Sequence, residues 1–222
     1  MTTPRSIAED AHVAADLFVA AADESSPYAE EALASLLASF PAAAARTDEW
    51  APVVRELGRS LQSAHAALVE AATALSDREN ELIEAQRDRE EASELLRQEL
   101  SALRMVVGAV FGHDSLTAMG LDREIPEEPL ALVRMAGEVR DGLSRLSGFE
   151  ALRSGMALSP RMYEASLSSA LHTLTSAMAT LRNAARARRN ADAVYERAGD
   201  LYRARGNEAA NALERLLRRK QG

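Results

Sequence analysis

A seven-residue repeat of apolar side chains limits how this chain can fold more than any other feature of its sequence. Eight of its nine positions are apolar: Val54, Leu61, Leu68, Leu75, Leu82, Arg89, Leu96, Leu103 and Val110. A companion line, three residues further on each time, is rich in small side chains: Leu57, Ala64, Ala71, Arg78, Ala85, Ala92, Glu99 and Val106. Two lines with this period are typical of a coiled-coil seam. Alanine on one of them favours a close antiparallel pair of helices.

The placement of proline indicates where long helices can lie. Residues 53–125 and 161–222 contain no proline. Because a proline inside a helix costs ~3 kcal/mol, both runs can be uninterrupted helices. We expect the first helix to begin at Asp48, a residue suited to cap a helix N-terminus, and to end at Gly112.

The second proline-free run predicts a helix of nearly the same length. Ser159 and Pro160 form its start, with serine as the cap and proline in the first turn. Gly206 and Asn207 are candidates for a break before the end of the chain. Its own repeat consists of Leu167, Leu174, Leu181, Arg188, Tyr195 and Tyr202.

The remaining segments predict shorter helices. The connector between the long helices contains six of the eleven glycines, and within it Pro129 opens an amphipathic helix that runs to about Leu146. We expect two short helices before the first long one. The predicted fold is all-α, a long antiparallel coiled-coil helical hairpin with short accessory helices packed at its ends. Its segments are 1–47 (short helices), 48–111 (first long helix), 112–158 (connector) and 159–222 (second long helix and tail).

Composition supports narrow helix-on-helix packing. The chain has 45 Ala and 29 Leu against 11 Val and 3 Ile, so good helix formers replace the β-branched residues that favour strands. Only 4% of the residues are aromatic. The absence of cysteine excludes disulfides, thiolate metal sites and cysteine nucleophiles. A bias of 25 Arg to one Lys is typical of a GC-rich, bacterial genome.

No histidine lies in a pattern that predicts a metal site or a catalytic site. Glu9 and His12 have the spacing of a di-iron ligand pair, but the pair occurs once, and Glu9 fits a helix cap better. His65 and His172 lack a Glu or His at ligand spacing. His113 is followed by Asp114, which is suited to begin a helical turn. We therefore expect no catalytic residue, no metal and no cofactor.

Charge divides the chain into two halves. Residues 1–125 have a net charge of −13 and residues 126–222 a net charge of +5. Arg182, Arg186 and Arg189 share one helical face, within a basic stretch that reaches Arg205, and such a stripe can contact a nucleic-acid backbone. Antiparallel pairing would instead set the stripe opposite the acidic residues 81–88. Internal neutralisation is the preferred interpretation, and nucleic-acid binding is the alternative.

An apolar segment, Met105 to Phe111, lies at the predicted hairpin end. It could touch a membrane, but packing against the connector explains it better, and the chain has no apolar stretch of the ~20 residues that span a bilayer. The first ten residues lack the apolar core of a secretory signal. These features predict a cytoplasmic protein.

The function expected from these features is that of a non-enzymatic scaffold or adaptor. It would act through helix-in-groove or coiled-coil contacts with a protein partner, and would form homo-oligomers. Nucleic-acid binding by the arginine stripe and membrane activity of the apolar segment are the alternatives. The predicted interaction seam consists of Leu61, Leu68, Leu75, Leu82, Leu96, Leu103, Leu167, Leu174 and Leu181.

Overall fold

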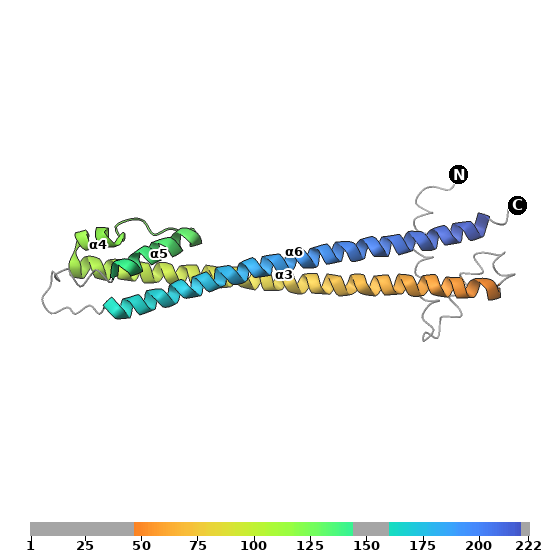
Figure 1. The fold of residues 1–222 in the computed structure, drawn as a ribbon, viewed down its shortest axis with the longest axis horizontal. Helices are drawn as coiled ribbons and strands as arrows, with labels where there is room; N and C mark the ends of the chain where they lie inside the picture. Colours follow the sequence, from red (N-terminus) through yellow and green to blue (C-terminus); the bar gives the residue numbers. More distant parts are fainter. Residues whose placement is uncertain (1–46, 144–159, 219–222) are drawn as a thin grey trace. The chain divides into compact units, whose positions relative to one another are not determined.

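The computed structural model describes residues 47–143 and 160–218 (Figure 1), and side chains within 51–143 and 162–212. The described chain is all-α. Its helices are α3 (Thr47–Phe111), α4 (His113–Met119), α5 (Pro129–Leu143) and α6 (Pro160–Arg218). The two long ones, α3 and α6, form an antiparallel helical hairpin, so the predicted fold class is confirmed. The short helices expected before residue 47 lie outside the described residues.

The chain divides into two compact units, and each contains part of α3 and part of α6. The first comprises residues 1–77 and 189–222, and the second comprises residues 78–188. In the first unit the ring of His65 lies against that of Tyr202, with 5.7 Å between centroids. Leu68 in turn lies beside Gly199. As α3 advances by three residues its neighbour on α6 goes back by three, so the helices run antiparallel.

The second unit has the same antiparallel pairing. Arg188 Nη2 lies 3.1 Å from Glu79 Oε1. Further along α3, Ala92 lines the same groove as Ala177 of α6. The predicted pairing of the two long helices within one chain is therefore found in this unit as well.

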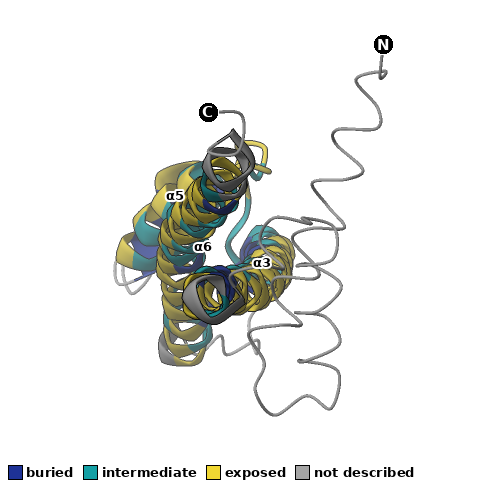
Figure 2. Ribbon diagram, turned by 90° about the vertical axis from the view of Figure 1, so that its right-hand side faces the viewer, coloured by how far each residue is buried: buried dark blue, intermediate teal, exposed yellow. Residues whose placement is uncertain are grey.

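Four helices contribute to the core of the second unit, which is wider than a two-helix seam. Leucine side chains of α3, α5 and α6 meet there. Seven of them are almost completely buried: Leu96, Leu100, Leu103, Leu132, Leu143, Leu167 and Leu174. Burial of one such side chain contributes ~1.5–3 kcal/mol. Figure 2 shows exposed residues on the outer faces of the helices and buried ones on their inner sides.

The second line of the predicted seam is buried in this core at Ala92, but it is wrong at its last two positions. Glu99 and Val106 were expected in the seam, but both are partly exposed, whereas Leu100 and Val107 are completely buried. The buried positions lie one residue further along because α5 also packs beside α3 here. A helix with two neighbours buries a wider part of its surface than a helix with one.

The connector contains a helix that the sequence did not predict. Helix α4 is flanked by Gly112 (φ 82°) and Gly120 (φ 70°), whose positive φ values suit glycine. After α4, the N–H of Leu121 donates to the carbonyl of Leu116 at 2.8 Å and closes the helix end. Helix α5 then begins as predicted, and Glu128 caps it by accepting hydrogen bonds from the N–H groups of Leu130 and Ala131.

The sequence offered Gly206 and Asn207 as candidates for a break in the second long helix, and the helix has no break there. Helix α6 continues through Gly206 and Asn207 to Arg218. A glycine inside a helix costs only ~1 kcal/mol relative to alanine, which the surrounding turns can supply.

Candidate functional site

The described residues contain no cluster suited to binding a metal ion. Among them, no group of three or more His, Cys, Asp or Glu side chains could hold a metal ion. His113 and His172 are exposed, and His65 packs on Tyr202. Asp114 lies in the first turn of α4, where a carboxylate is favoured by the helix dipole. Glu9 and His12 lie outside the described residues.

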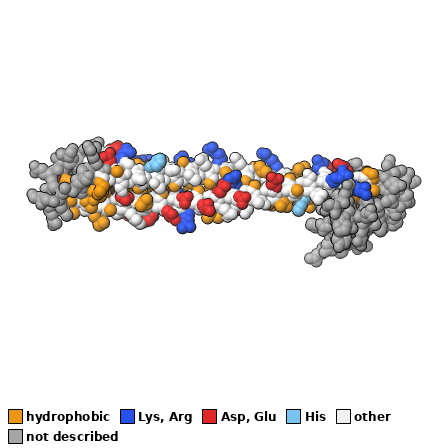
Figure 3. Space-filling view, turned by 90° about the horizontal axis from the view of Figure 1, so that it is seen from below, with side chains coloured by type: hydrophobic (Ala, Val, Ile, Leu, Met, Phe, Trp, Pro, Cys, Tyr) orange, Lys and Arg blue, Asp and Glu red, His pale blue; other side chains and the backbone are white. Residues whose placement is uncertain are grey.

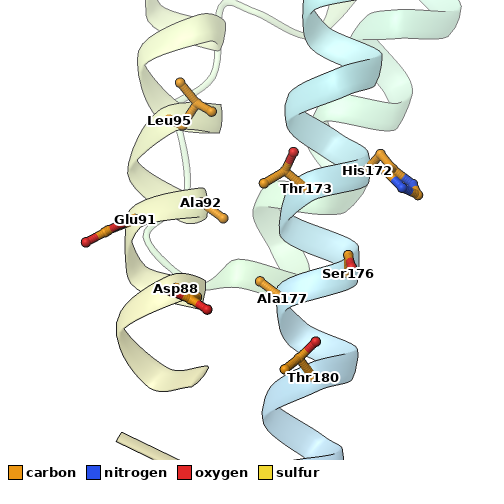
Figure 4. Close-up of a pocket in the computed structure, with 9 residues that line it drawn as sticks. All are labelled: Asp88, Glu91, Ala92, Leu95, His172, Thr173, Ser176, Ala177 and Thr180. Atoms are coloured by element: carbon orange, nitrogen blue, oxygen red, sulfur yellow. The ribbon is translucent and has the colours of Figure 1, made fainter. Parts of the chain in front are cut away.

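An open groove between α3 and α6 is the most distinctive surface of the second unit. It has a volume of about 550 Å³. Figure 4 shows Ala92 and Ala177 pointing into the space between the helices, while Glu91 and His172 point away on opposite sides. Leu95, on its rim, is 44% exposed. The lining residues are Asp88, Glu91, Ala92, Leu95, His172, Thr173, Ser176, Ala177 and Thr180.

This groove continues into a second one, because Asp88 and Thr180 line both. The second has a volume of about 420 Å³ and is lined by Glu81, Glu84, Ala85, Asp88, Thr180, Asn183, Ala184 and Ala187. We call the two together the acidic groove. Its α3 side carries the carboxylates of Glu81, Glu84, Asp88 and Glu91, and no Arg or Lys is among its lining residues. Acidic side chains gather along one stretch of the face drawn in Figure 3.

Two of these carboxylates are paired within their own helix. Arg87 Nε donates to Glu91 Oε1 at 2.8 Å, and this hydrogen bond together with the charge of Glu91 raises the pKa of Arg87. Arg78 Nη1 donates to Glu81 Oε1 at 2.6 Å. Glu84 and Asp88 are exposed and form no ion pair with any described residue. The middle of the acidic groove therefore presents two carboxylates that form no salt bridge with a described residue, although the charge of Asp88 also acts on the neighbouring Arg87.

The three arginines of the predicted stripe do not neutralise this acidic stretch. Arg182, Arg186 and Arg189 are all exposed, and none forms an ion pair with a described residue. Arg182 donates instead to the Met178 carbonyl of its own helix, at 3.3 Å. The expected internal neutralisation is thus not found for these three.

The physical reason lies in the helical position of each arginine. Arg188 belongs to the repeat that faces α3, and it reaches Glu79. Arg182 and Arg186 are each two residues from Ala184, which is buried against α3. Two residues correspond to about 200° of helical rotation, so both arginines project from the side of α6 that is turned away from α3.

The predicted seam leucines occupy the inside of the hairpin. Leu61, Leu96, Leu103, Leu167 and Leu174 are buried, whereas Leu68, Leu75, Leu82 and Leu181 are half-buried. Most of their apolar surface is therefore buried within the chain. The sequence did show the spacing of the acids from Glu81 to Glu91, but not which flank they occupy.

The apolar segment at the end of α3, Met105 to Phe111, is also partly buried within the chain. Val107 and Val110 are buried, and Phe111 packs against the core, while Met105 remains 70% exposed. None of the helices in the described ranges is both long and apolar enough to cross a membrane.

Comparison with known proteins gives no relative from which a role could be transferred: no family model, no curated protein and no solved structure matches this chain.

Proposed function

We propose that this protein is a non-enzymatic scaffold or adaptor, which binds a helix of a partner protein along the outside of its hairpin. The observation that carries the proposal is the acidic groove, a flank of α3 and α6 in the second unit that none of the described residues covers. A groove between two helices is a common site for a third, because the ridge of one helix fits between the ridges of two others.

The side chains of the acidic groove suit a basic amphipathic helix. Its floor consists of the small residues Ala85, Ala92, Ala177 and Ala184, which leave room for a third helix to approach closely. Leu95 offers an exposed apolar contact at one end. Glu84 and Asp88 offer carboxylates to Arg or Lys side chains. Such a helix would bury apolar surface and form charge-assisted hydrogen bonds at the same time.

Binding of a synthetic peptide tests the proposal. The probe is a labelled amphipathic helix of about 20 residues, ~30 Å long, with Leu on one face and Arg beside it. We expect fluorescence anisotropy to give a Kd of about 1–100 μM. A peptide with Glu in place of each Arg should not bind, because it meets like charge in the acidic groove.

Two tryptophan variants locate the site. Thr180→Trp fills the acidic groove, since Thr180 lines both of its parts. Thr73→Trp is the matched control, because Thr73 is an exposed threonine of α3 that does not line the groove. We expect Thr180→Trp to weaken peptide binding about tenfold or more. Equal affinities of both variants, or no binding by the wild type, would overturn the proposal.

A second candidate function rests on the exposed arginines. Because Arg182, Arg186 and Arg189 have no ion-pair partner among the described residues, they are available to phosphates. The chain as a whole is acidic, with a net charge of −8, and this opposes nucleic-acid binding. Submicromolar affinity for duplex DNA, with a log–log salt slope of about −0.9 per phosphate contacted and loss on changing all three to Gln, would favour this function.

A further inference from the structure

We infer that the occupant of the acidic groove is a second copy of this chain, which inserts the arginine-bearing face of its α6. This inference rests on the proposed function, because it names the partner of the same groove. The contact would join Glu84 and Asp88 of one copy to Arg186 and Arg182 of the other.

The charges on the two surfaces are complementary and equally spaced. Glu84 and Asp88 are four residues apart on α3, and Arg182 and Arg186 are four residues apart on α6. All four side chains are exposed, and none has an ion pair with a described residue. Four residues correspond to ~6 Å along a helix. The two arginines are therefore as far apart as the two carboxylates, and one alignment of the helices brings each arginine to one carboxylate.

The match extends beyond the charged residues. On α3 the groove residues Glu84, Asp88, Glu91 and Leu95 follow one another at intervals of four, three and four. On α6 the outer face has the same intervals, at Thr175, Ala179, Arg182 and Arg186. Antiparallel alignment therefore sets Arg186 against Glu84, Arg182 against Asp88, Ala179 against Glu91 and Thr175 against Leu95.

In this alignment the residues of α6 beyond the two ion pairs have small side chains. Ala179 and Thr175 allow the incoming helix to lie close to α3 beyond the two ion pairs, and the Thr175 methyl group meets the exposed side chain of Leu95. Glu91, opposite Ala179, keeps its partner Arg87. No carboxylate in this alignment faces another carboxylate.

A single chain cannot form these pairs by itself. Arg182 and Arg186 lie on the side of α6 remote from α3, whereas Glu84 and Asp88 line the groove between the two helices. Each copy thus carries both an acidic groove and a basic face. The contact joins two different surfaces, the acidic groove of one copy and the basic face of the other.

Charge reversal tests the inference on the full chain. One variant carries Glu84→Arg with Asp88→Arg, and the other carries Arg182→Glu with Arg186→Glu. The readout is the weight-average mass from analytical ultracentrifugation between about 1 and 200 μM protein. We expect the wild type to self-associate at about 50 mM salt and to dissociate at about 500 mM, because exposed charges are screened.

Each variant alone should remain monomeric, because its acidic groove and its arginine face now have the same sign. An equimolar mixture of the two should associate like the wild type, because every contact in the mixture is again between opposite charges. Recovery in the mixture also shows that both variants are folded. The control, Glu70→Arg with Glu164→Arg, makes the same change in net charge as Glu84→Arg with Asp88→Arg, but at exposed carboxylates outside the contact, and should behave as the wild type.

A monomeric wild type at the highest concentration would overturn the inference, as would variants that associate alone or fail to recover when mixed. The proposed function can fail separately, because it is measured by binding of the arginine peptide. A monomeric chain that binds the peptide through the acidic groove would retain the scaffold function and exclude the second copy as its occupant. Loss of both activities would reject both.

Discussion

Two glycines of α5 provide a sharp test of how this helix packs. Gly137 lies in the middle of the helix, and a Cβ atom added there would meet nothing within 4 Å. Gly142 is buried near its end, and a Cβ atom there would lie 3.2 Å from Met119 Cγ and 3.3 Å from Met119 Cα. The same substitution by alanine therefore has opposite consequences at the two positions.

The magnitudes follow from these surroundings. Gly137→Ala gains only the difference in helix propensity, and should stabilise the protein by ~0.5–1 kcal/mol. Gly142→Ala has at most the same gain, but it forces the backbone of α4 away from α5. Overpacking of this kind costs ~1–3 kcal/mol, so the variant should be less stable than the wild type by up to ~2 kcal/mol.

Urea unfolding followed by far-UV circular dichroism measures both variants, and thermal unfolding gives an independent check. A change of 1 kcal/mol corresponds to about 2–4 °C in Tm for a chain of this size. If Gly142→Ala were as stabilising as Gly137→Ala, the close packing of α5 on Met119 would be refuted. A loss of stability from Gly137→Ala would show that this face of α5 is covered.

Three further changes test other parts of the fold. Leu100→Ala, at a fully buried position, should lower the free energy of unfolding by ~2–5 kcal/mol, whereas Leu95→Ala at the exposed rim should cost much less; urea titrations of both decide this. Gly120→Ala should cost ~1–2 kcal/mol in the same assay, because its φ of 70° is unfavourable for alanine. Arg188→Gln should cost at most ~1 kcal/mol, and thermal melts should show that salt reduces the difference, since its pair with Glu79 is exposed.

The sequence predicted the features that depend on the spacing of apolar residues and on the positions of proline. The heptad spacing from Val54 to Val110 predicted the pairing of α3 with α6, because only a regular line of apolar residues can be buried along a whole helix. Proline at positions 129 and 160 predicted the starts of α5 and α6. These signals are local, so they can be seen without knowledge of the packing.

Features that depend on a third helix could not be predicted in this way. The burial of Leu100 instead of Glu99 follows from the position of α5, which the repeat of α3 does not encode. Helix α4 has only seven residues, too few to show a period.

The candidate site was hidden for a related reason. Net charge suggested that Arg182 and Arg186 would neutralise the acids of α3, but charge balance does not show which side of a helix a residue occupies. Their position relative to the buried Ala184 decides this, and it became clear only when the facing side of α6 was known.

The ion pairs of α3 affect how the hairpin can open. Arg78 binds Glu81, Arg87 binds Glu91 and Arg97 binds Glu94, each within one turn of the same helix. Pairs at this spacing stabilise a helix before it contacts any other element. Each such pair adds ~0.2–0.5 kcal/mol, so we expect α3 to lose less helical order on separation from α6 than a helix without these pairs would lose. Added salt should weaken α3 as an isolated helix more than it weakens the apolar seam.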